Sequence, residues 1–315
     1  MPRSLLLSIH CNAMDQPLVS IIIPTYNQSQ YVEKTVMSCL EQTYSNIEIL
    51  ISDDASADGT ATIALDLARR FPDKVKAEIN QQNLGVSANC NQLLRRCQGR
   101  YVALFAGDDL MYASKIARQV DQLESDSNLA LSSHDMHIVS GDADDDTPTG
   151  SWSDFNRTGG GGYEALMEHL CFVCGCSLLV RRDCIPSSGY VESIVASDWL
   201  LFNEVLLHAD QQIGYVDEVL GAYRRRPGQL TAKSSPDSIS LFMDHAFACG
   251  YLSAKYSESA RVVATGLRNW KSATQNTIRD NSMWGDDVTD SKLNSPRWLF
   301  RRLLKSIWNR IGRNS

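Results

Sequence analysis

Short apolar segments alternate with amphipathic segments along the first part of the chain. Residues 18–23 form the first apolar segment, and others of similar length follow at 47–52, 75–79 and 101–105. In the stretches between them, apolar residues are spaced three and four positions apart, as on one face of a helix. This order predicts an α/β domain in which a mostly parallel sheet is flanked by helices.

The pattern becomes less regular after residue 125. Segment 141–162 is rich in Asp, Gly, Thr and Ser, a composition that predicts a mobile loop. From about residue 236 onward the apolar spacing is helical. In between, the pattern predicts one or two strands, a short strand, an apolar helix and a bent strand or strand pair, at 129–139, 177–181, 199–207 and 213–223.

These patterns divide the 315 residues into three parts. We expect an N-terminal tail over 1–16, one large domain over 17–231 and a helical C-terminal extension over 232–315. The domain consists of a regular half, 17–125, and a less regular half, 126–231. Because 43% of the residues are hydrophobic and 21% are charged, a chain of this length can bury a large core.

The charge balance argues against one class of partner. With a net charge of −7, the protein is not expected to bind nucleic acid over its whole surface. The sequence contains no apolar run long enough to span a bilayer as a helix. The nine cysteines are scattered, and Cys39, Cys90 and Cys97 fall on apolar helical positions, which fits reduced and buried thiols. We therefore expect a cytoplasmic protein.

Three of the predicted strands end in residues suited to a nucleotide diphosphate. Residues 24–27 (Pro-Thr-Tyr-Asn) follow the first strand, 53–56 (Asp-Asp-Ala-Ser) the second and 107–109 (Gly-Asp-Asp) the fourth. In open parallel sheets, ligands bind beyond the carboxyl ends of the strands. There an aromatic ring can stack on a base, a carboxylate can accept an imide N–H, and paired aspartates can hold a hard cation on the diphosphate. Each segment alone also fits an ordinary turn or helix cap, so the hypothesis rests on their combination.

The segments around these strand ends resemble the family 2 glycosyltransferases, inverting enzymes with the GT-A fold that use nucleotide sugars. The resemblance is specific over 17–125, thinner to about residue 231 and absent after that. It implies that 17–125 is the nucleotide-sugar-binding half and that 126–231 is the acceptor-binding half. It is carried by five segments, at 19–27, 40–44, 48–60, 83–89 and 107–109.

The resemblance also implies a role for each matching position. Asp108 would hold the ribose or the sugar, and Asp109 would hold a divalent cation, Mn²⁺ or Mg²⁺, on the diphosphate. Two further residues, Thr25 and Asn83, belong to the same nucleotide-sugar site. Three positions would hold the base: Pro24, Tyr26 and Asp54.

An inverting transfer needs a base opposite the leaving diphosphate, to take the proton from the acceptor hydroxyl. The family places an acidic residue at the start of a helix in its second half, often as a Glu-Asp pair before an aromatic residue. Ser197, Asp198 and Trp199 occupy that place, so Asp198 is the expected catalytic base, with Ser197 in place of the usual acid. The alternative for Asp198 is a carboxylate that stabilises the helix N-terminus. Glu192 is the next candidate for the base if the alignment of this half is shifted.

A second departure from the family pattern lies at 223–226. Family members often read Tyr-Arg-x-His here, with the His near the metal or the diphosphate, and Arg226 stands in the His position. Arginine does not ligate a cation, but its guanidinium can form a forked contact with a phosphate. Arg226 is therefore expected in the nucleotide-sugar site, and the alternative is a solvated basic turn.

The implied function is the transfer of a sugar from a nucleotide-diphosphate sugar, expected to be a UDP-sugar, to an acceptor hydroxyl with inversion. The acceptor would be a glycan or a lipid-linked glycan of surface polysaccharide or glycolipid biosynthesis. The alternative is a protein of the same fold that binds nucleotide sugars with weak or no turnover, because Ser197 and Arg226 depart from the family pattern. A dinucleotide oxidoreductase is not expected, since no G-x-G-x-x-G follows the first strand.

The C-terminal segment 296–313 reverses the charge of the rest of the chain. Its apolar residues, Trp298 and Trp308 among them, fall on one helical stripe bordered by basic residues, and no acidic residue follows Asp290. A basic amphipathic helix with interfacial tryptophans can lie on an anionic membrane surface. We therefore expect a peripheral contact with the inner face of the cell membrane. The alternative is a helix that packs on the catalytic domain with its arginines in solvent.

Overall fold

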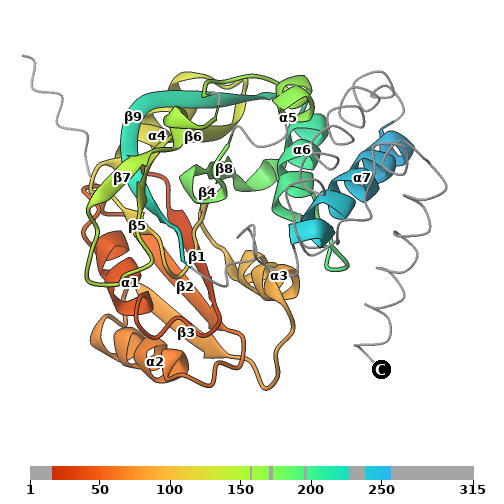
Figure 1. Cartoon of the computed structure of the whole chain (residues 1–315). Coiled ribbons are helices and arrows are strands. Elements are labelled where there is room, and N and C mark those ends of the chain that lie inside the picture. Colours follow the sequence, from red (N-terminus) through yellow and green to blue (C-terminus); the bar gives the residue numbers. More distant parts are fainter. Residues whose placement is uncertain (1–15, 157, 170–172, 195–196, 227–237, 257–315) are drawn as a thin grey trace, which may run out of the picture.

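The computed structural model shows one sheet with helices on both of its faces (Figure 1). Among the described residues the sheet has nine strands in the order β3-β2-β1-β4-β8-β6-β9-β5, and β7 pairs with β6 beside this path. The first four strands of the chain are therefore neighbours at one end of the sheet. The structure describes residues 16–156, 158–169, 173–194, 197–226 and 238–256.

The first half of the domain alternates strand and helix as its pattern predicts. Strands β1 to β4 pair in parallel, with β1 between β2 and β4 and with β3 at the edge. Their carboxyl ends therefore meet along one edge of the sheet. The elements are β1 (Val19–Thr25), α1 (Val32–Leu40), β2 (Ile47–Asp53), α2 (Thr60–Arg70), β3 (Val75–Ile79), α3 (Val86–Arg96) and β4 (Tyr101–Leu104).

The second half extends this sheet mainly with antiparallel pairs. Strand β8 lies antiparallel between β4 and β6, whereas the long strands β6 and β9 pair in parallel with several shifts of register. Parallel pairing therefore dominates the first half only. The remaining elements are β5 (Leu110–Met111), α4 (Lys115–Ser125), β6 (Leu129–Val139), β7 (Pro148–Ser151), α5 (Tyr163–His169), β8 (Leu179–Arg181), α6 (Ser197–Ala209), β9 (Gln212–Arg224), α7 (Ser238–Lys255) and three 3₁₀ helices, η1 (Trp152–Asp154), η2 (Gly175–Ser177) and η3 (Arg182–Cys184).

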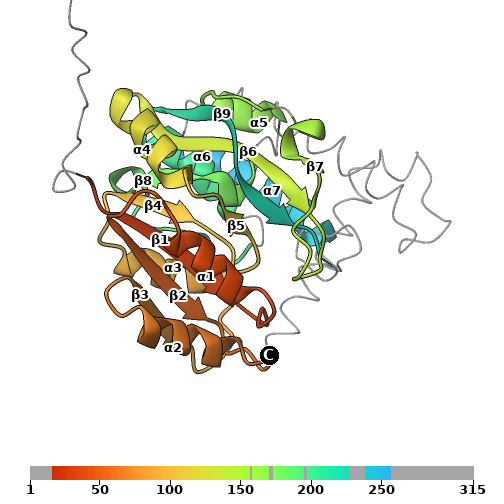
Figure 2. The ribbon, with the colours of Figure 1, turned by 90° about the vertical axis from the view of Figure 1, so that its left-hand side faces the viewer.

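Alternate residues of the central strands point into two hydrophobic cores, one on each face of the sheet. Ile21 and Ile23 of β1 pack with residues of α1, α2 and α4, whereas Ile22 packs with residues of α3 and α6. Figure 2 shows α1 and α2 on the near side of β1–β3 and α3 on the far side. Because both faces are covered, these strands read as continuous apolar runs in the sequence.

One part of the second half differs from the expectation. Segment 141–162, predicted to be a mobile loop, contains β7 and η1. Residues 140–146, which we call the acidic segment and which include its beginning, contact the buried Arg224 of β9 through carbonyl and carboxylate groups. This long-range contact orders the segment, and its composition alone does not reveal it.

The remaining predictions concern the cysteines, membrane-spanning helices and the C-terminal part of the chain. Cys39, Cys90 and Cys97 are buried, as predicted, and all seven cysteines in the described part are free thiols. Among the described helices, none is long and apolar enough to cross a membrane. The domain boundary near residue 231 and the basic segment 296–313 lie outside the described residues.

Candidate active site

Three strand ends meet at the candidate site. The N–H of Asp54, after β2, donates to the carbonyl of Thr25 at the end of β1 (2.9 Å). A Cβ atom added to Gly107, after β4, would lie 2.8 Å from the methyl group of Thr25 and 2.5 Å from Oε1 of Gln28. Only glycine permits so close an approach, so the turn that carries Asp108 sits directly against the end of β1.

The Asp54 carboxylate is held by the loop that leads into α3. Its Oδ1 accepts hydrogen bonds from the Asn80 side chain (2.9 Å) and the Leu84 N–H (2.8 Å), and its Oδ2 accepts one from the Gly85 N–H (2.9 Å). The exposed Asn83 also belongs to this loop, since its Oδ1 accepts from the Gly85 N–H (3.1 Å). The carboxylate is therefore fixed in one orientation, at a helix N-terminus that favours its negative charge.

Exposed apolar side chains lie on the segments that meet at Asp54. Tyr26, which follows β1, is 50% exposed, and Leu84 and Val86 in the loop before α3 and at its start are 38% and 43% exposed. Pro24, in β1, is half-buried. Large apolar groups in solvent beside a fixed carboxylate can cover the face of a flat ligand.

Thr25, which the resemblance assigns to the nucleotide-sugar site, directs its side chain into the fold. It is buried, and its hydroxyl donates to Oδ1 of Asp53 (3.1 Å). Asp53 is also buried and accepts hydrogen bonds from the N–H and the hydroxyl of Ser56 (2.9 and 2.6 Å). Thr25 and Asp53 therefore tie the ends of β1 and β2 together, and the assignment of Thr25 to the nucleotide-sugar site stays a prediction.

Asp108 and Asp109, which we call the Asp turn, follow β4 and are both buried. Oδ1 of Asp109 accepts a hydrogen bond from the backbone N–H of Arg224 (2.9 Å). Its Oδ2 is buried and has no hydrogen-bond partner within the described part of the chain. Burial and, after it, the charge of Asp108 raise the pKa of Asp109 to about 8. The Asp turn thus contains a carboxylate whose negative charge is poorly compensated.

Arg226 points at the Asp turn. Its Nε donates to Oδ2 of Asp108 (2.6 Å), and its guanidinium lies 5.5 Å from the ring centroid of Tyr31 in the loop before α1. The side chains of Arg226 and Asp108 are 22% and 6% exposed. Arg226 is therefore packed against the Asp turn and is not a solvated basic residue, and its contact with a phosphate stays a prediction.

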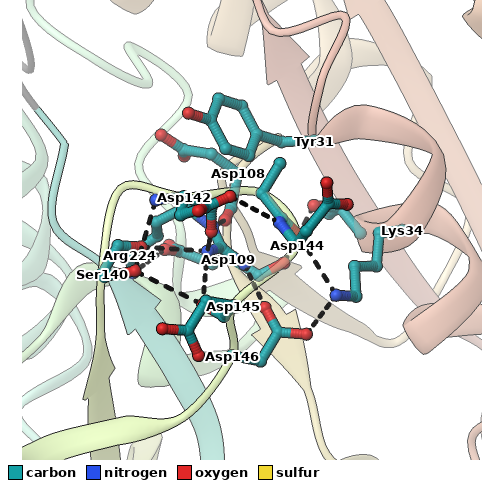
Figure 3. Close-up of polar contacts among 12 residues, drawn as sticks. Tyr31, Lys34, Asp108, Asp109, Ser140, Asp142, Asp144, Asp145, Asp146 and Arg224 are labelled. Atoms are coloured by element: carbon teal, nitrogen blue, oxygen red, sulfur yellow. Dashed lines mark hydrogen bonds and ion pairs between the residues drawn. The ribbon is translucent and has the colours of Figure 1, made fainter.

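Arg224 is the centre of a polar network that the sequence did not indicate (Figure 3). Its side chain is 1% exposed, and its Nη1 donates to the carbonyls of Ser140 (3.0 Å) and Asp142 (2.5 Å). Its Nη2 donates to the Asp146 carboxylate (2.5 Å), and its Nε to the carbonyl of Asp108 (3.0 Å). Arg224 therefore joins the acidic segment to the Asp turn.

Helix α1 and the loop before it hold the acidic segment from the other side. The hydroxyl of Tyr31 donates to the carbonyl of Gly141 (2.7 Å). Lys34 donates to the carbonyl of Ala143 (3.3 Å) and forms an ion pair with Asp146. The acidic segment is thus clamped between α1 and β9, next to the Asp turn.

Asp198 lies in the first turn of α6 with its side chain exposed. Its Oδ1 accepts the N–H of Trp199 (2.7 Å), and a Cβ atom added to Gly175 would lie 3.5 Å from its Oδ2. Burial raises the pKa of the Cys90 thiol to about 12, and the charges of Asp198 and Asp54 both add to this shift. The negative charges of both carboxylates, one from each half of the domain, therefore act on the same thiol of α3.

Two residues close to Asp198 in the sequence, Ser197 and Glu192, form hydrogen bonds with side chains of α3. Ser197 is buried and shares a hydrogen bond of 2.6 Å with the hydroxyl of Ser87 on α3. Glu192, the other candidate for the base, accepts a hydrogen bond from the Asn91 side chain on α3 (2.9 Å). Ser197 therefore anchors α6 to α3, whereas the side chain of Asp198 beside it is exposed.

The 3₁₀ helix η2 connects the Asp turn to Asp198. Gly175 lies beside Asp198, as described above, and the thiol of Cys176 lies close enough to Asp109 to lower the pKa of that carboxyl. Neither residue was predicted to contribute to the site. The signal in the sequence was weak, because 174–176 reads only as a short Cys-Gly-Cys segment before a strand.

The Asp turn fits a divalent cation. The buried, poorly compensated Oδ2 of Asp109 is the kind of oxygen that Mg²⁺ or Mn²⁺ binds. Across the described residues, however, no three His, Cys, Asp or Glu side chains come together as a metal site. A cation at Asp109 would therefore need oxygens of a bound diphosphate to complete its coordination.

Solved structures share this fold. Residues 1–349 of S. aureus TarS, solved in complex with UDP-GlcNAc, match with a TM-score of 0.66 at 18% identity, over 89% of this chain and 78% of that chain. The mannosyltransferase PcManGT from Pyrobaculum calidifontis, solved with GDP-Man and Mn²⁺, matches with a TM-score of 0.58 at 17% identity, over 88% of this chain and 90% of that chain. At these identities the likeness concerns the fold, and it confirms the predicted GT-A-type α/β architecture.

Curated relatives resemble part of the chain. TuaG of Bacillus subtilis, a glycosyltransferase provisionally assigned to teichuronic acid biosynthesis, is 38% identical over 106 residues, which are 34% of this chain and 42% of TuaG. EpsE of the same organism, also provisionally a glycosyltransferase, is 37% identical over 108 residues, 34% of this chain and 39% of EpsE. The matches thus span about two fifths of the length of these relatives.

A family model matches a larger part of the chain. The model described as glycosyl transferase family 2 covers residues 20–186, more than half of the 315 residues. The matched region contains Asp54, the Asp turn and η2, while Asp198 and Arg226 follow it. The chain belongs to glycosyltransferase family 2.

Proposed function

We propose that the enzyme transfers a sugar from a nucleotide-diphosphate sugar, a UDP-sugar by our expectation, to an acceptor hydroxyl with inversion at the anomeric carbon. One observation carries this proposal: Gly175 of η2 lies against Asp198, while β9 holds the Asp turn through the hydrogen bond from the Arg224 N–H to Asp109. Separate elements around one edge of the sheet thus supply three kinds of carboxylate. One could bind the nucleobase, one could hold the cation on the diphosphate, and one could accept a proton.

The contacts of Asp54 favour a base with an imide-type N–H. A carboxylate offers about four lone-pair sites, and three of those on Asp54 already accept hydrogen bonds from the loop before α3. The remaining one can accept the N–H of uracil or guanine, whereas adenine and cytosine present no ring N–H there. Tyr26 and Pro24 would then cover the base, with Asn83 at the rim of the same loop.

The Asp turn and Arg226 are suited to the rest of the donor. Asp108 would accept a hydroxyl of the ribose or the sugar, and Arg226 would contact the phosphates in the forked geometry of a guanidinium. Asp109 would hold Mn²⁺ or Mg²⁺ together with the diphosphate oxygens. When bound, that cation supplies positive charge that stabilises the leaving diphosphate.

Asp198 is our proposed catalytic base. Its carboxylate is exposed at the start of α6, where an acceptor can reach it. The acceptor oxygen forms a bond to the anomeric carbon as the bond from that carbon to the diphosphate oxygen breaks. The proton of the acceptor hydroxyl passes to the carboxylate of Asp198. Attack from the face opposite the leaving group inverts the configuration.

The acceptor and the location of the enzyme follow from the same resemblance. We propose an acceptor in surface polysaccharide or glycolipid biosynthesis, either a glycan or a lipid-linked one, and the provisional assignment of TuaG supports this class. The residues after the catalytic domain of 17–231 would hold the enzyme at the inner face of the cell membrane through segment 296–313. The active site would then lie in the cytoplasm near lipid-linked acceptors.

A thermal-shift screen of nucleotide sugars with and without Mn²⁺ tests this proposal. A ligand that binds only the folded state raises the melting temperature, so a UDP-sugar with Mn²⁺ should stabilise the enzyme more than an ADP-sugar does. No stabilisation by any nucleotide sugar would contradict the proposal. Stabilisation without release of nucleotide, when every candidate acceptor class is supplied, would instead support a binding protein with weak or no turnover.

A further inference from the structure

We propose that Phe155 and Arg225 bind the acceptor, and that this acceptor is a glycan with negatively charged groups. The inference rests on the proposed function and adds the chemical class of the acceptor to it. The guanidinium of Arg225 lies 5.5 Å from the centroid of the Phe155 ring. Both side chains are exposed, and Phe155, at 65%, is more exposed than any other large hydrophobic residue in the part of the chain that the structure describes.

The exposed ring of Phe155 follows a short helix that is fixed to the sheet. The N–H and the hydroxyl of Ser153 in η1 donate to the two oxygens of the buried Asp135 carboxylate in β6 (3.1 and 2.6 Å). The N–H of Phe155 donates to the carbonyl of Trp152 (3.1 Å), and the Trp152 ring meets the Tyr223 ring of β9 edge to face. The ring is therefore held in place before a ligand arrives, which lowers the entropic cost of binding.

The Phe155 ring lies beside the end of β9 that contacts the Asp turn. The backbone N–H of Arg224 and the side chain of Arg226 both donate to the Asp turn. Their guanidinium groups lie against the Tyr31 ring, whereas the guanidinium of Arg225, between them in the sequence, lies against Phe155. This alternation is that of a strand, so Arg225 extends from the other face of β9 next to the proposed donor site.

This other face of β9 is also the face that η2 covers. Tyr223 and Gly221 share it, because they are two positions apart in the strand. A Cβ atom added to Gly221 would lie 3.0 Å from Sδ of Met136, and Met136 belongs to the hydrophobic cluster that includes a residue of η2 and that Tyr223 packs against. Asp198 lies beside η2. The exposed ring and the proposed catalytic base are thus reached from the same face, so one acceptor glycan can contact both.

The chemistry of the pair favours a sugar with an acidic group. The C–H groups of a sugar ring can pack on the electron-rich face of an aromatic ring. Arg224 and Arg226 each pair with a carboxylate, whereas Arg225 forms no ion pair with any residue that the structure describes. Asp154 in η1 accepts the N–H of Ser151 (2.7 Å) instead. The Arg225 guanidinium can therefore form a forked contact with a carboxylate or a phosphate of the glycan.

Binding of the full chain to an array of oligosaccharides tests the class of acceptor. The array contains oligosaccharides with uronic acid carboxylates, others with phosphate groups and neutral ones of the same length, and UDP and Mn²⁺ are present throughout. We expect at least one acidic class to bind about fivefold or more tightly than the neutral class, with a preference that decreases as salt is added. The two acidic arms show which anion is recognised. No preference for acidic members over neutral ones would overturn the proposal.

Matched variants assign this binding to the two side chains. Arg225→Gln should weaken binding of the preferred acidic oligosaccharide about tenfold, the effect of one hydrogen bond to a charged group. Arg95→Gln, at an exposed position near the end of α3, is its control. Phe155→Leu, which keeps an apolar side chain without a flat ring, should weaken the same binding about fivefold, and Phe247→Leu at an exposed position of α7 is its control. Equal affinities within either pair would overturn the proposal.

The proposed function fails on a different measurement. If no nucleotide sugar raises the melting temperature of the wild-type enzyme, the donor assignment is wrong whatever the array shows. If a nucleotide sugar stabilises the enzyme and the array shows no preference for acidic glycans, only the assignment of the acceptor is overturned.

Discussion

The backbone N–H of Arg224 donates a hydrogen bond of 2.9 Å to the carboxylate of Asp109, although 115 positions separate the two residues. The side chain of the same arginine donates to the carbonyl of Asp108 and to the acidic segment. The end of β9 thus fixes the position of the turn after β4. The geometry of the proposed cation and diphosphate site depends on this contact between the two halves of the domain.

Arg224→Met should destabilise the fold strongly. It removes a buried charge, takes one of its two basic partners from the Asp146 carboxylate, which keeps Lys34, and removes the arginine donor from three carbonyl groups. The loss of one partner from a buried ion pair costs about 3–5 kcal/mol. Urea denaturation at neutral pH measures this change, with Arg225→Met at the exposed neighbouring position as the control. Equal free energies of unfolding for both variants would show that the network contributes little.

Asp54→Asn should weaken both the fold and nucleotide binding. The amide group of Asn would face at least one of the N–H donors that the carboxylate now accepts, from Asn80, Leu84 or Gly85. A buried donor left without a partner costs about 1–3 kcal/mol. Asp73→Asn, at an exposed position, is the matched control. The account of this loop would be wrong if the two variants unfolded at the same urea concentration and bound UDP equally.

Glu48→Gln should lower the stability of the enzyme in a pH-dependent way. Burial alone would raise the pKa of Glu48, but hydrogen bonds from Ser20, Gln98 and Lys76 outweigh it and hold the pKa below its ordinary value. A carboxyl whose pKa is lowered in the folded state contributes stability above its unfolded pKa and loses it as the pH falls through the folded value.

The loss of unfolding free energy caused by Glu48→Gln should therefore be constant from neutral pH to about pH 5 and become smaller in more acidic solution. Its size at neutral pH should be about 1–2 kcal/mol, from the lost hydrogen bonds to a charged group. Glu41→Gln, an exposed position, controls for the general effect of charge. A loss of unfolding free energy that became larger as the pH fell from 5 to 3 would contradict this prediction.

A chain that ends at residue 294 tests the membrane interpretation. Each basic residue near an anionic surface contributes about 1 kcal/mol, and salt screens this attraction. The shortened chain should lose salt-sensitive binding to vesicles that contain anionic lipid and keep the hydrolysis of the donor. Equal vesicle binding by both chains would exclude a membrane contact through 296–313, and loss of folding would favour a helix packed on the domain.

The first half of the fold, and the strand ends that meet at the candidate site, could be predicted because their signals are local. Strand ends, apolar spacing and the segments around Asp54 and the Asp turn lie close together in the sequence. Thr25 was assigned to the ligand from its place in a matching segment. The two-residue period of β1 puts it on the same face as Ile21 and Ile23, a signal that indicates its buried orientation.

The acidic segment and η2 could not be predicted, because their roles depend on contacts between distant parts of the chain. Arg224 reaches carbonyls that are 82 and 84 positions away, and the composition of the acidic segment is that of a loop in solvent. Gly175 and Cys176 acquire their role only when η2 comes to lie between the Asp turn and Asp198. Neither Gly175 nor Cys176 lies in a sequence motif that indicates a role in the site.

The most direct test of the account is the release of UDP from a UDP-sugar by Asp198→Asn, compared with the wild-type enzyme under saturating donor and Mn²⁺. Asn keeps the size of the side chain and the hydrogen bond from the Trp199 N–H but cannot take up a proton. The rate should fall about a hundredfold or more, the usual contribution of a positioned base, while the affinity for the donor stays within about twofold. Release at the wild-type rate would contradict the assignment of Asp198 as the base.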